Sequence, residues 1–85
     1  MKPKQIRLFV KTYCPWCNEA IDWLDQNRIS YELLDVNTDA DARREMVSLS
    51  DQSKAPVLEV DGKILADFGA AELAAWWEQQ GYEAV

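Results

Sequence analysis

The sequence predicts an α/β fold in which three helices cover the faces of one mixed four-stranded sheet. Apolar runs rich in strand-forming residues alternate with segments of helical periodicity, which gives the order β-α-β-α-β-β-α. The strand–helix–strand units imply a parallel pair with a right-handed crossover. An Asp61-Gly62 dipeptide between two later apolar runs implies an antiparallel hairpin. A length of 85 residues leaves room for one domain, residues 1–85.

The first strand and the first helix are indicated by an apolar run and by a proline. The expected strands are residues 6–10, 31–35, 57–60 and 63–65, and the expected helices are residues 15–27, 40–50 and 70–80. The run 6–10, Ile-Arg-Leu-Phe-Val, is typical of a buried strand. Pro15 suits the first position of a helix, because its φ is helical and its missing N–H would have no partner there. Ala20, Ile21 and Leu24 recur at helical spacing, which predicts the buried side of that helix.

The later elements have caps and turns of their own. The apolar run over residues 31–35 predicts the second strand. Thr38 or Asp39 offers the side-chain oxygen that caps the second helix. Asp61-Gly62 supplies the positive φ of a tight turn between the third and fourth strands. Gly81 is placed to end the last helix, since glycine readily adopts the left-handed conformation common at that position.

The charge balance argues against two classes of partner. The chain has 15 acidic and 9 basic residues, a formal net charge of −6, and no basic run. We therefore expect no binding to nucleic acid or to an anionic membrane surface. No apolar run approaches the ~20 residues that span a bilayer, and the N-terminal residues lack the apolar stretch of a secretory signal. The expected location is the cytoplasm.

The chain has two cysteines, Cys14 and Cys17, and no histidine. A disulfide between residues so close in sequence constrains the unfolded chain little, and the cytoplasm disfavours structural disulfides. A four-ligand zinc site needs more Cys or His ligands than the chain offers, so we predict no metal site. The remaining interpretations are a redox pair, or a half-site that another molecule completes.

The segment Cys14-Pro15-Trp16-Cys17 lies between a predicted strand and a predicted helix, the setting of a redox-active Cys-x-x-Cys motif. The thiolate, rather than the thiol, is the nucleophile in disulfide exchange. Free N–H groups and the dipole at a helix N-terminus favour an anion, so Cys14 receives more of this stabilisation than Cys17, one turn further on. A pKa of about 6 or lower makes Cys14 mostly thiolate at neutral pH. Lys11 adds a positive charge upstream.

The spacing of the two cysteines predicts that one attacks the substrate and the other resolves the mixed disulfide. Residues i and i+3 at a helix start face the same side, close enough for an intramolecular disulfide. Cys14 is therefore expected to attack a substrate disulfide, and Cys17 to resolve the mixed disulfide that forms. Pro15 stiffens the turn and Trp16 gives the site an apolar rim. The pattern indicates a thiol–disulfide oxidoreductase acting on disulfide-containing substrates.

On these residues the chain resembles the glutaredoxins. The likeness rests on Cys14-Pro15-Trp16-Cys17, on Lys11-Thr12-Tyr13 before it, on Ala55-Pro56-Val57 and on the order of elements, and it runs over nearly the whole chain. It implies the thioredoxin-like fold, with reduction of protein disulfides or glutathione mixed disulfides as the activity. Glutathione is then the electron-donating cosubstrate, and no cofactor is tightly bound. We expect a monomer.

The resemblance also assigns roles to residues around the two cysteines. It implies that Lys11 pairs with a carboxylate of glutathione, and that Tyr13 and Trp16 are the aromatic residues flanking the nucleophile. Ala55-Pro56 matches a segment in which the family has a cis proline, and the residue before that proline offers backbone hydrogen bonds to the bound peptide. A cis X–Pro bond costs only about 0.5–1 kcal/mol. A trans proline that starts a strand is the alternative.

The chain departs from the family after the hairpin. Glutaredoxins there hold the γ-glutamyl end of glutathione with Gly-Gly, a Cys or Thr, and an Asp, whereas this chain has Ala-Asp-Phe-Gly-Ala-Ala over residues 66–71. The N–H groups of Ala70 and Ala71, which open the last helix, are expected to bind that carboxylate instead. Asp67 or Glu72 is the candidate partner for the glutathione amine.

Two alternative functions stay open. The segment that holds Phe68 resembles glutaredoxin-like electron donors of ribonucleotide reductase, which implies a redoxin reduced by thioredoxin reductase. The residues between the two cysteines differ in those proteins. Some glutaredoxins instead share an iron–sulfur cluster between two chains, through the first cysteine and external thiols. Pro15 argues against such a dimer by family analogy, because a rigid turn hinders the rearrangement that the cluster needs.

Overall fold

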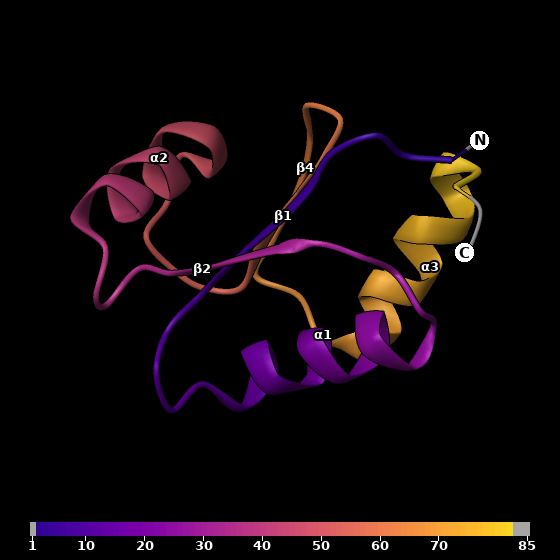
Figure 1. Ribbon diagram of the computed structural model, residues 1–85, viewed down its shortest axis with the longest axis horizontal. Helices are drawn as coiled ribbons and strands as arrows, with labels where there is room; N and C mark the ends of the chain where they lie inside the picture. The colour runs from indigo at the N-terminus through magenta and orange to yellow at the C-terminus, as the bar shows by residue number, and fades with distance from the viewer. Residues whose placement is uncertain (1, 83–85) are drawn as a thin grey trace.

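The computed structural model describes residues 2–82 and confirms the predicted order of elements (Figure 1). The elements are β1 Ile6–Val10, α1 Pro15–Gln26, β2 Glu32–Asp35, α2 Ala40–Ser50, β3 Val57–Val60, β4 Lys63–Ala66 and α3 Ala70–Gln80. They form one mixed four-stranded sheet in the order β2-β1-β3-β4. The β1–β2 pair is parallel, and the β1–β3 and β3–β4 pairs are antiparallel. The expected hairpin and the expected parallel strand–helix–strand unit are both present.

Three boundaries differ from the expectation by one residue. Helix α1 ends at Gln26 because Asn27 leaves the helical conformation, and its side-chain amide donates to the Trp23 carbonyl at 2.8 Å. Strand β2 begins at Glu32 rather than Tyr31. Strand β4 extends to Ala66, which is the register partner of Val57. Each difference concerns an element end, where boundaries commonly vary by one or two residues.

The helices cover both faces of the sheet, with α1 and α3 on one side and α2 on the other (Figure 1). Side chains alternate along β1, so Leu8 and Val10 face α1 and α3, while Phe9 faces α2. The first core cluster consists of Leu8, Val10, Cys17, Ala20, Leu24, Ile29, Leu58, Val60, Phe68, Leu73, Trp77 and Tyr82. The second is smaller and consists of Phe9, Val36, Ala42, Met46 and Val57.

Two predicted helix ends are seen in their atomic detail. Of the two candidate caps for α2, Asp39 performs the role, since its carboxylate accepts a hydrogen bond from the N–H of Ala42 at 3.1 Å. Helix α3 ends at Gln80 and is capped by Gly81, which has a φ of 75°. That left-handed conformation is the one a glycine adopts without steric cost.

A cluster of three charged side chains lies on the α2 face of the sheet. The sequence predicts the strand that holds Arg7 as a buried apolar strand and does not indicate this cluster. Arg7 and Glu59 are register partners on β1 and β3, and the Arg7 Nε donates to Glu59 Oε1 at 2.5 Å. The same guanidinium also pairs with Glu45 of α2. Glu59 is 9% exposed. The Glu59 hydrogen bond is the main reason why the pKa of Arg7 is raised, which keeps the guanidinium charged.

The strand register brings three loops to one edge of the sheet. Val57 at the start of β3 pairs with Phe9 near the end of β1, and also with Ala66 at the end of β4. The segment after β1, the segment before β3 and the segment after β4 therefore lie together. The cysteines follow β1, so this edge holds the candidate active site.

Candidate active site

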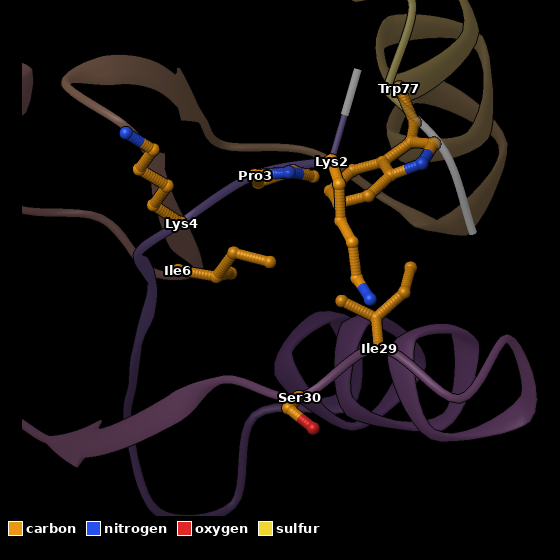
Figure 2. Close-up of a pocket in the computed structure, with 7 residues that line it drawn as sticks. All are labelled: Lys2, Pro3, Lys4, Ile6, Ile29, Ser30 and Trp77. Carbon is orange, nitrogen blue, oxygen red and sulfur yellow. The ribbon is translucent and has the colours of Figure 1, made fainter. Parts of the chain in front are cut away.

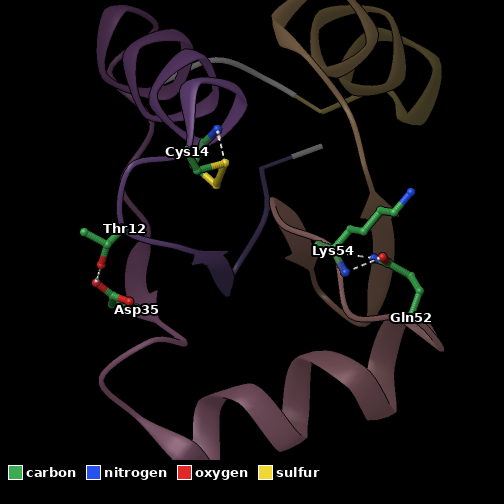
Figure 3. The surroundings of a disulfide bond; sticks show 6 residues. Thr12, Cys14, Asp35, Gln52 and Lys54 are labelled. Atoms are coloured by element: carbon green, nitrogen blue, oxygen red, sulfur yellow. Dashed lines mark hydrogen bonds between the residues drawn. A yellow bond between two sulfur atoms is a disulfide. The ribbon is translucent and has the colours of Figure 1, made fainter.

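Cys14 and Cys17 form a disulfide at the start of α1 (Figure 3). Their Cα atoms are 5.1 Å apart, within the range usual for disulfides. Cys14 is the N-cap of α1, and its Sγ accepts a hydrogen bond from the backbone N–H of Cys17 at 3.1 Å. Its carbonyl accepts the first intrahelical bond, from the N–H of Asn18 at 3.0 Å. The sulfur of Cys14 thus occupies the capping position that a side-chain oxygen fills in other helices.

The two sulfurs differ in access to solvent. Cys17 is 1% exposed and belongs to the larger core cluster. Cys14 is half-buried and only packs against that cluster from its edge. Solvent therefore reaches Cys14 more readily than it reaches Cys17.

The electrostatic setting of Cys14 is that of a helix N-terminus with no opposing charge in its first turn. No acidic residue lies in the first turn of α1, so nothing there offsets the positive end of the helix dipole. Lys11 lies half-buried in the loop between β1 and the motif. The same loop is tied to the end of β2, because the Thr12 hydroxyl donates to Asp35 Oδ2 at 3.2 Å (Figure 3).

The aromatic residues that flank Cys14 are both exposed. Tyr13 is 97% exposed and has a φ of 57°. Trp16 is 56% exposed, and its indole lies against Gly69 at the start of α3. A Cβ on Gly69 would come within 2.8 Å of Trp16 Cζ3. The glycine is therefore what allows the indole to lie beside the start of α3.

The peptide bond between Ala55 and Pro56 is cis, as the family resemblance implies. Pro56 is buried and Ala55 is half-buried. The Pro56 carbonyl accepts a hydrogen bond from the N–H of Asp67 at 3.0 Å, which joins the segments before β3 and after β4.

The loop that leads to this proline is held by one side chain. The Gln52 amide accepts from the N–H of Lys54 at 2.6 Å and donates to its carbonyl at 2.9 Å (Figure 3). Gln52 thus holds both backbone groups of Lys54. These two hydrogen bonds hold the backbone of the residue just before Ala55.

The start of α3 has an internal partner. The N–H of Ala70 donates to Glu19 Oε1 of α1 at 3.3 Å. Ala71 is exposed. Asp67 and Glu72, the candidate acidic groups, line a small pocket of about 80 Å³ together with Trp16, Phe68 and Gly69. Phe68 itself is 4% exposed and belongs to the larger core cluster.

A larger pocket, of about 250 Å³, lies at the other end of β1 (Figure 2). It is lined by Lys2, Pro3, Lys4, Ile6, Ile29, Ser30 and Trp77. It contains neither cysteine and none of the predicted site residues. This pocket is therefore not the site of disulfide chemistry, although it is larger than the pocket beside Trp16.

Residues 2–82 contain no group of three or more His, Cys, Asp or Glu side chains that could hold a metal ion. Within the same part of the chain, no helix has the length and apolarity needed to cross a membrane.

Three residues of this region were not predicted from the sequence. Gln52 and Glu19 act through hydrogen bonds to other parts of the chain, and Gly69 acts by its lack of a Cβ. The only sequence signal was that Gly69 directly precedes a predicted helix. The contact from Glu19 spans 51 positions of sequence and needs the tertiary structure to be seen.

Comparison with protein families gives a match to the family model described as Glutaredoxin, over residues 6–65. A curated relative from Clostridium pasteurianum is 37% identical over 68 residues, which cover 80% of this chain and 91% of the relative. That relative is described as an uncharacterized glutaredoxin-like 8.6 kDa protein in the rubredoxin operon. The matched share of both chains is large enough to compare the whole domain.

Solved structures show the same fold. The thioredoxin-like protein BC3987 superposes with a TM-score of 0.77 at 30% identity, covering 84% of this chain and 97% of that one. A glutaredoxin from Archaeoglobus fulgidus gives a TM-score of 0.70 at 14% identity, covering 84% and 83% of the two chains. A buckwheat glutaredoxin–glutathione complex gives 0.68 at 20% identity, covering 89% and 69%. The last two likenesses concern the fold alone.

Proposed function

This chain belongs to the glutaredoxin family of thiol–disulfide oxidoreductases, and from that membership we propose that it reduces protein disulfides or glutathione mixed disulfides through Cys14 and Cys17. Glutathione is the electron-donating cosubstrate in this proposal, and no resident cofactor takes part. The protein acts as a monomer in the cytoplasm, where thiols are kept reduced.

The reaction is a pair of thiol–disulfide exchanges. The Cys14 thiolate attacks one sulfur of the substrate disulfide, the other sulfur leaves as a thiolate and takes a proton, and a mixed disulfide forms. The Cys17 thiol then loses its proton and attacks Cys14 Sγ. The second substrate thiol leaves, and the Cys14–Cys17 disulfide remains. Two glutathione molecules then reduce the Cys14–Cys17 disulfide. The first attacks Cys14 Sγ and forms a mixed disulfide, which releases the Cys17 thiol. The second attacks the glutathione sulfur of that mixed disulfide, which releases glutathione disulfide and the Cys14 thiol.

The observation that carries the assignment of roles is the unequal access to the two sulfurs. Cys14 is half-buried at the helix start, whereas Cys17 is 1% exposed. The Cys17 N–H, 3.1 Å from Cys14 Sγ, is placed to stabilise negative charge on that sulfur. Cys14 is therefore the nucleophile in our proposal, and Cys17 the resolving thiol.

The proposed binding surface for glutathione surrounds Cys14. Tyr13 and Trp16 offer exposed aromatic faces next to the nucleophile. The cis Ala55–Pro56 segment lies at the same edge of the sheet, so the backbone of Ala55 supports the proposed contact with an extended peptide. Lys11 supplies a positive charge for a carboxylate. Further backbone contacts are proposed at Ala70 and Ala71, which open α3; at Ala70 the ligand replaces the Glu19 carboxylate that accepts this N–H in the structure.

The test of this proposal is a pair of cysteine variants. Cys14→Ser is expected to abolish turnover in a glutathione-coupled assay of a mixed disulfide. Cys17→Ser is expected to keep the first exchange and some monothiol turnover, because glutathione itself resolves the mixed disulfide. Full activity in Cys14→Ser would show that the assigned nucleophile is wrong.

A second electron donor is favoured by one observation. The N–H of Ala70 is bonded to Glu19 rather than free, which weakens the case for a glutathione carboxylate at this position. The alternative is reduction by thioredoxin reductase. NADPH consumption with each reducing system separates the two, since turnover with thioredoxin reductase but none with glutathione selects the alternative.

A further inference from the structure

The start of α3 is occupied by a carboxylate that belongs to the chain itself. Glu19 on α1 accepts the N–H of Ala70 at 3.3 Å. Unbonded N–H groups at a helix start attract anions through their partial positive charge. A substrate carboxylate that approached Ala70 must first displace the carboxylate of Glu19. The contact also places a negative charge one turn of α1 beyond Trp16.

Two further carboxylates lie around the same contact. Asp67 and Glu72 line the small pocket that Trp16 and Gly69 share. Glu72 Oε2 is 3.2 Å from the position that a Cβ on Gly69 would take. Trp16 directly precedes Cys17 in the first turn of α1, and its side chain lines this pocket, so the pocket lies where the start of α1 meets the start of α3. The junction between the starts of α1 and α3 therefore carries three carboxylates, those of Glu19, Asp67 and Glu72. The positive charge of Lys11 lies on the other side of the motif in sequence, on the loop from β1.

We infer that Glu19, together with the charges of Asp67 and Glu72, makes this site select disulfides with neutral or basic flanking groups over disulfides that carry a carboxylate. The inference rests on the proposed function and narrows its substrate class. The preferred substrates are protein disulfides with a Lys or Arg near the reacting cysteine, and glutathione disulfide is a poorer substrate. The exchange reaction itself is unchanged: the dithiol gives two electrons and two protons to either disulfide.

The experiment measures how fast the reduced protein reacts with three small disulfides. Cystamine is cationic, hydroxyethyl disulfide is neutral, and glutathione disulfide carries carboxylates. The second-order rate constants are measured for the wild type and for Glu19→Gln, Glu19→Ala and Glu78→Gln. Glu78 is the matched control, because it is an exposed glutamate at the far end of α3.

The quantity compared is the ratio of the glutathione disulfide rate to the cystamine rate. In Glu19→Gln this ratio is expected to rise about twofold to fivefold, the effect of one charge near a helix start. It should rise further in Glu19→Ala, which frees the Ala70 N–H, whereas the glutamine oxygen still accepts it. High salt is expected to shrink the glutamine effect, and the neutral disulfide should react equally in all variants.

The outcomes separate the inference from the proposed function. A ratio that stays at the Glu78→Gln value in both Glu19 variants overturns the inference while the exchange activity stands. A ratio that rises equally at low and high salt also overturns it, because the effect is then not one of charge. A wild type that reacts with none of the three disulfides overturns the proposed function itself.

Discussion

The backbone N–H of Cys17 lies 3.1 Å from the Sγ of Cys14, across the first turn of α1. A hydrogen bond to the sulfur favours its anionic form, and so does the position at the helix start. The neighbouring Cys17 has the opposite setting, because burial disfavours an anion. The two thiols of the reduced protein are thus expected to differ in acidity.

We predict that the Cys14 thiol of Cys17→Ser titrates below the value of an unperturbed cysteine, about 8.5. The ultraviolet absorbance of the thiolate as a function of pH measures this directly. Cys14→Ser is the control, and its remaining Cys17 should titrate at or above about 8.5. Equal pKa values in the two variants would contradict the proposal that Cys14 is the nucleophile and Cys17 the resolving thiol.

The indole of Trp16 gives a second prediction, because it lies too close to residue 69 to leave room for a Cβ there. Gly69→Ala must push the ring away, since the added carbon would come within 2.8 Å of Cζ3. Trp16 is 56% exposed, so we expect its ring to swing into solvent. We therefore expect a change of less than about 1 kcal/mol in unfolding free energy, the range of an N-cap Gly-to-Ala change, and a red shift in tryptophan fluorescence.

The control for Gly69→Ala is the same change in a Trp16→Phe background. The fluorescence shift should then vanish, because Trp16 is the only tryptophan among the three nearest contacts of a Cβ on Gly69. A shift that persists without Trp16 would mean that the substitution disturbs the core instead.

The charged cluster under α2 gives a prediction about stability. Arg7→Met leaves Glu59, which is 9% exposed, without its guanidinium partner. Removing one member of a buried ion pair typically costs about 3–5 kcal/mol. We expect a loss near the lower end of that range in urea unfolding, since Arg7 keeps 19% side-chain exposure.

The double variant Arg7→Met, Glu59→Leu tests the reason for this loss. It should recover much of the stability, because no unpaired charge then remains inside. A single Arg7→Met variant as stable as the wild type would show that the ion pair contributes little. A double variant no better than the single one would point to lost packing on Phe9, whose ring lies 5.4 Å from the Arg7 guanidinium carbon.

The Arg7–Glu59 contact also shows what the sequence alone could not predict: the partner of a charged side chain inside the sheet. The seven elements were predicted because their signals are local: Pro15 at a helix start, Asp61-Gly62 in a turn, and Gly81 at a helix end. The two cysteines could be identified for the same reason. Arg7 could not be placed, because an arginine inside an apolar strand gives no sign of which strand will supply its partner.

The surroundings of the disulfide were only partly predictable. The family resemblance pointed to Pro56, whose peptide bond is cis. It gave no indication of Glu19, because a glutamate on the exposed side of a helix has no local signature of a contact with α3. The role of Gln52 could not be predicted either, because in the sequence an amide that holds a neighbouring loop is indistinguishable from an ordinary surface residue.

The hydroxyl of Tyr31 gives a prediction about pH. It donates to Asp25 Oδ1 at 3.0 Å. Burial, followed by this hydrogen bond and by the charges of Asp25 and Asp22, raises the pKa of Tyr31 from 10.0 to about 12. The folded state thus holds the proton more tightly than the unfolded chain does.

The sign of the stability change follows from this difference. Below pH 10 the tyrosine is protonated in both states, and its contribution to stability is fully present. Between pH 10 and about 12 the unfolded chain releases the proton while the folded protein keeps it, so the free energy of unfolding falls. Urea unfolding across this window is expected to show a smaller fall in Tyr31→Phe, which cannot ionise. Tyr13→Phe is the matched control, because Tyr13 is 97% exposed. If Tyr31→Phe loses stability as steeply as Tyr13→Phe over the same window, the Tyr31–Asp25 bond is not the source of the alkaline sensitivity.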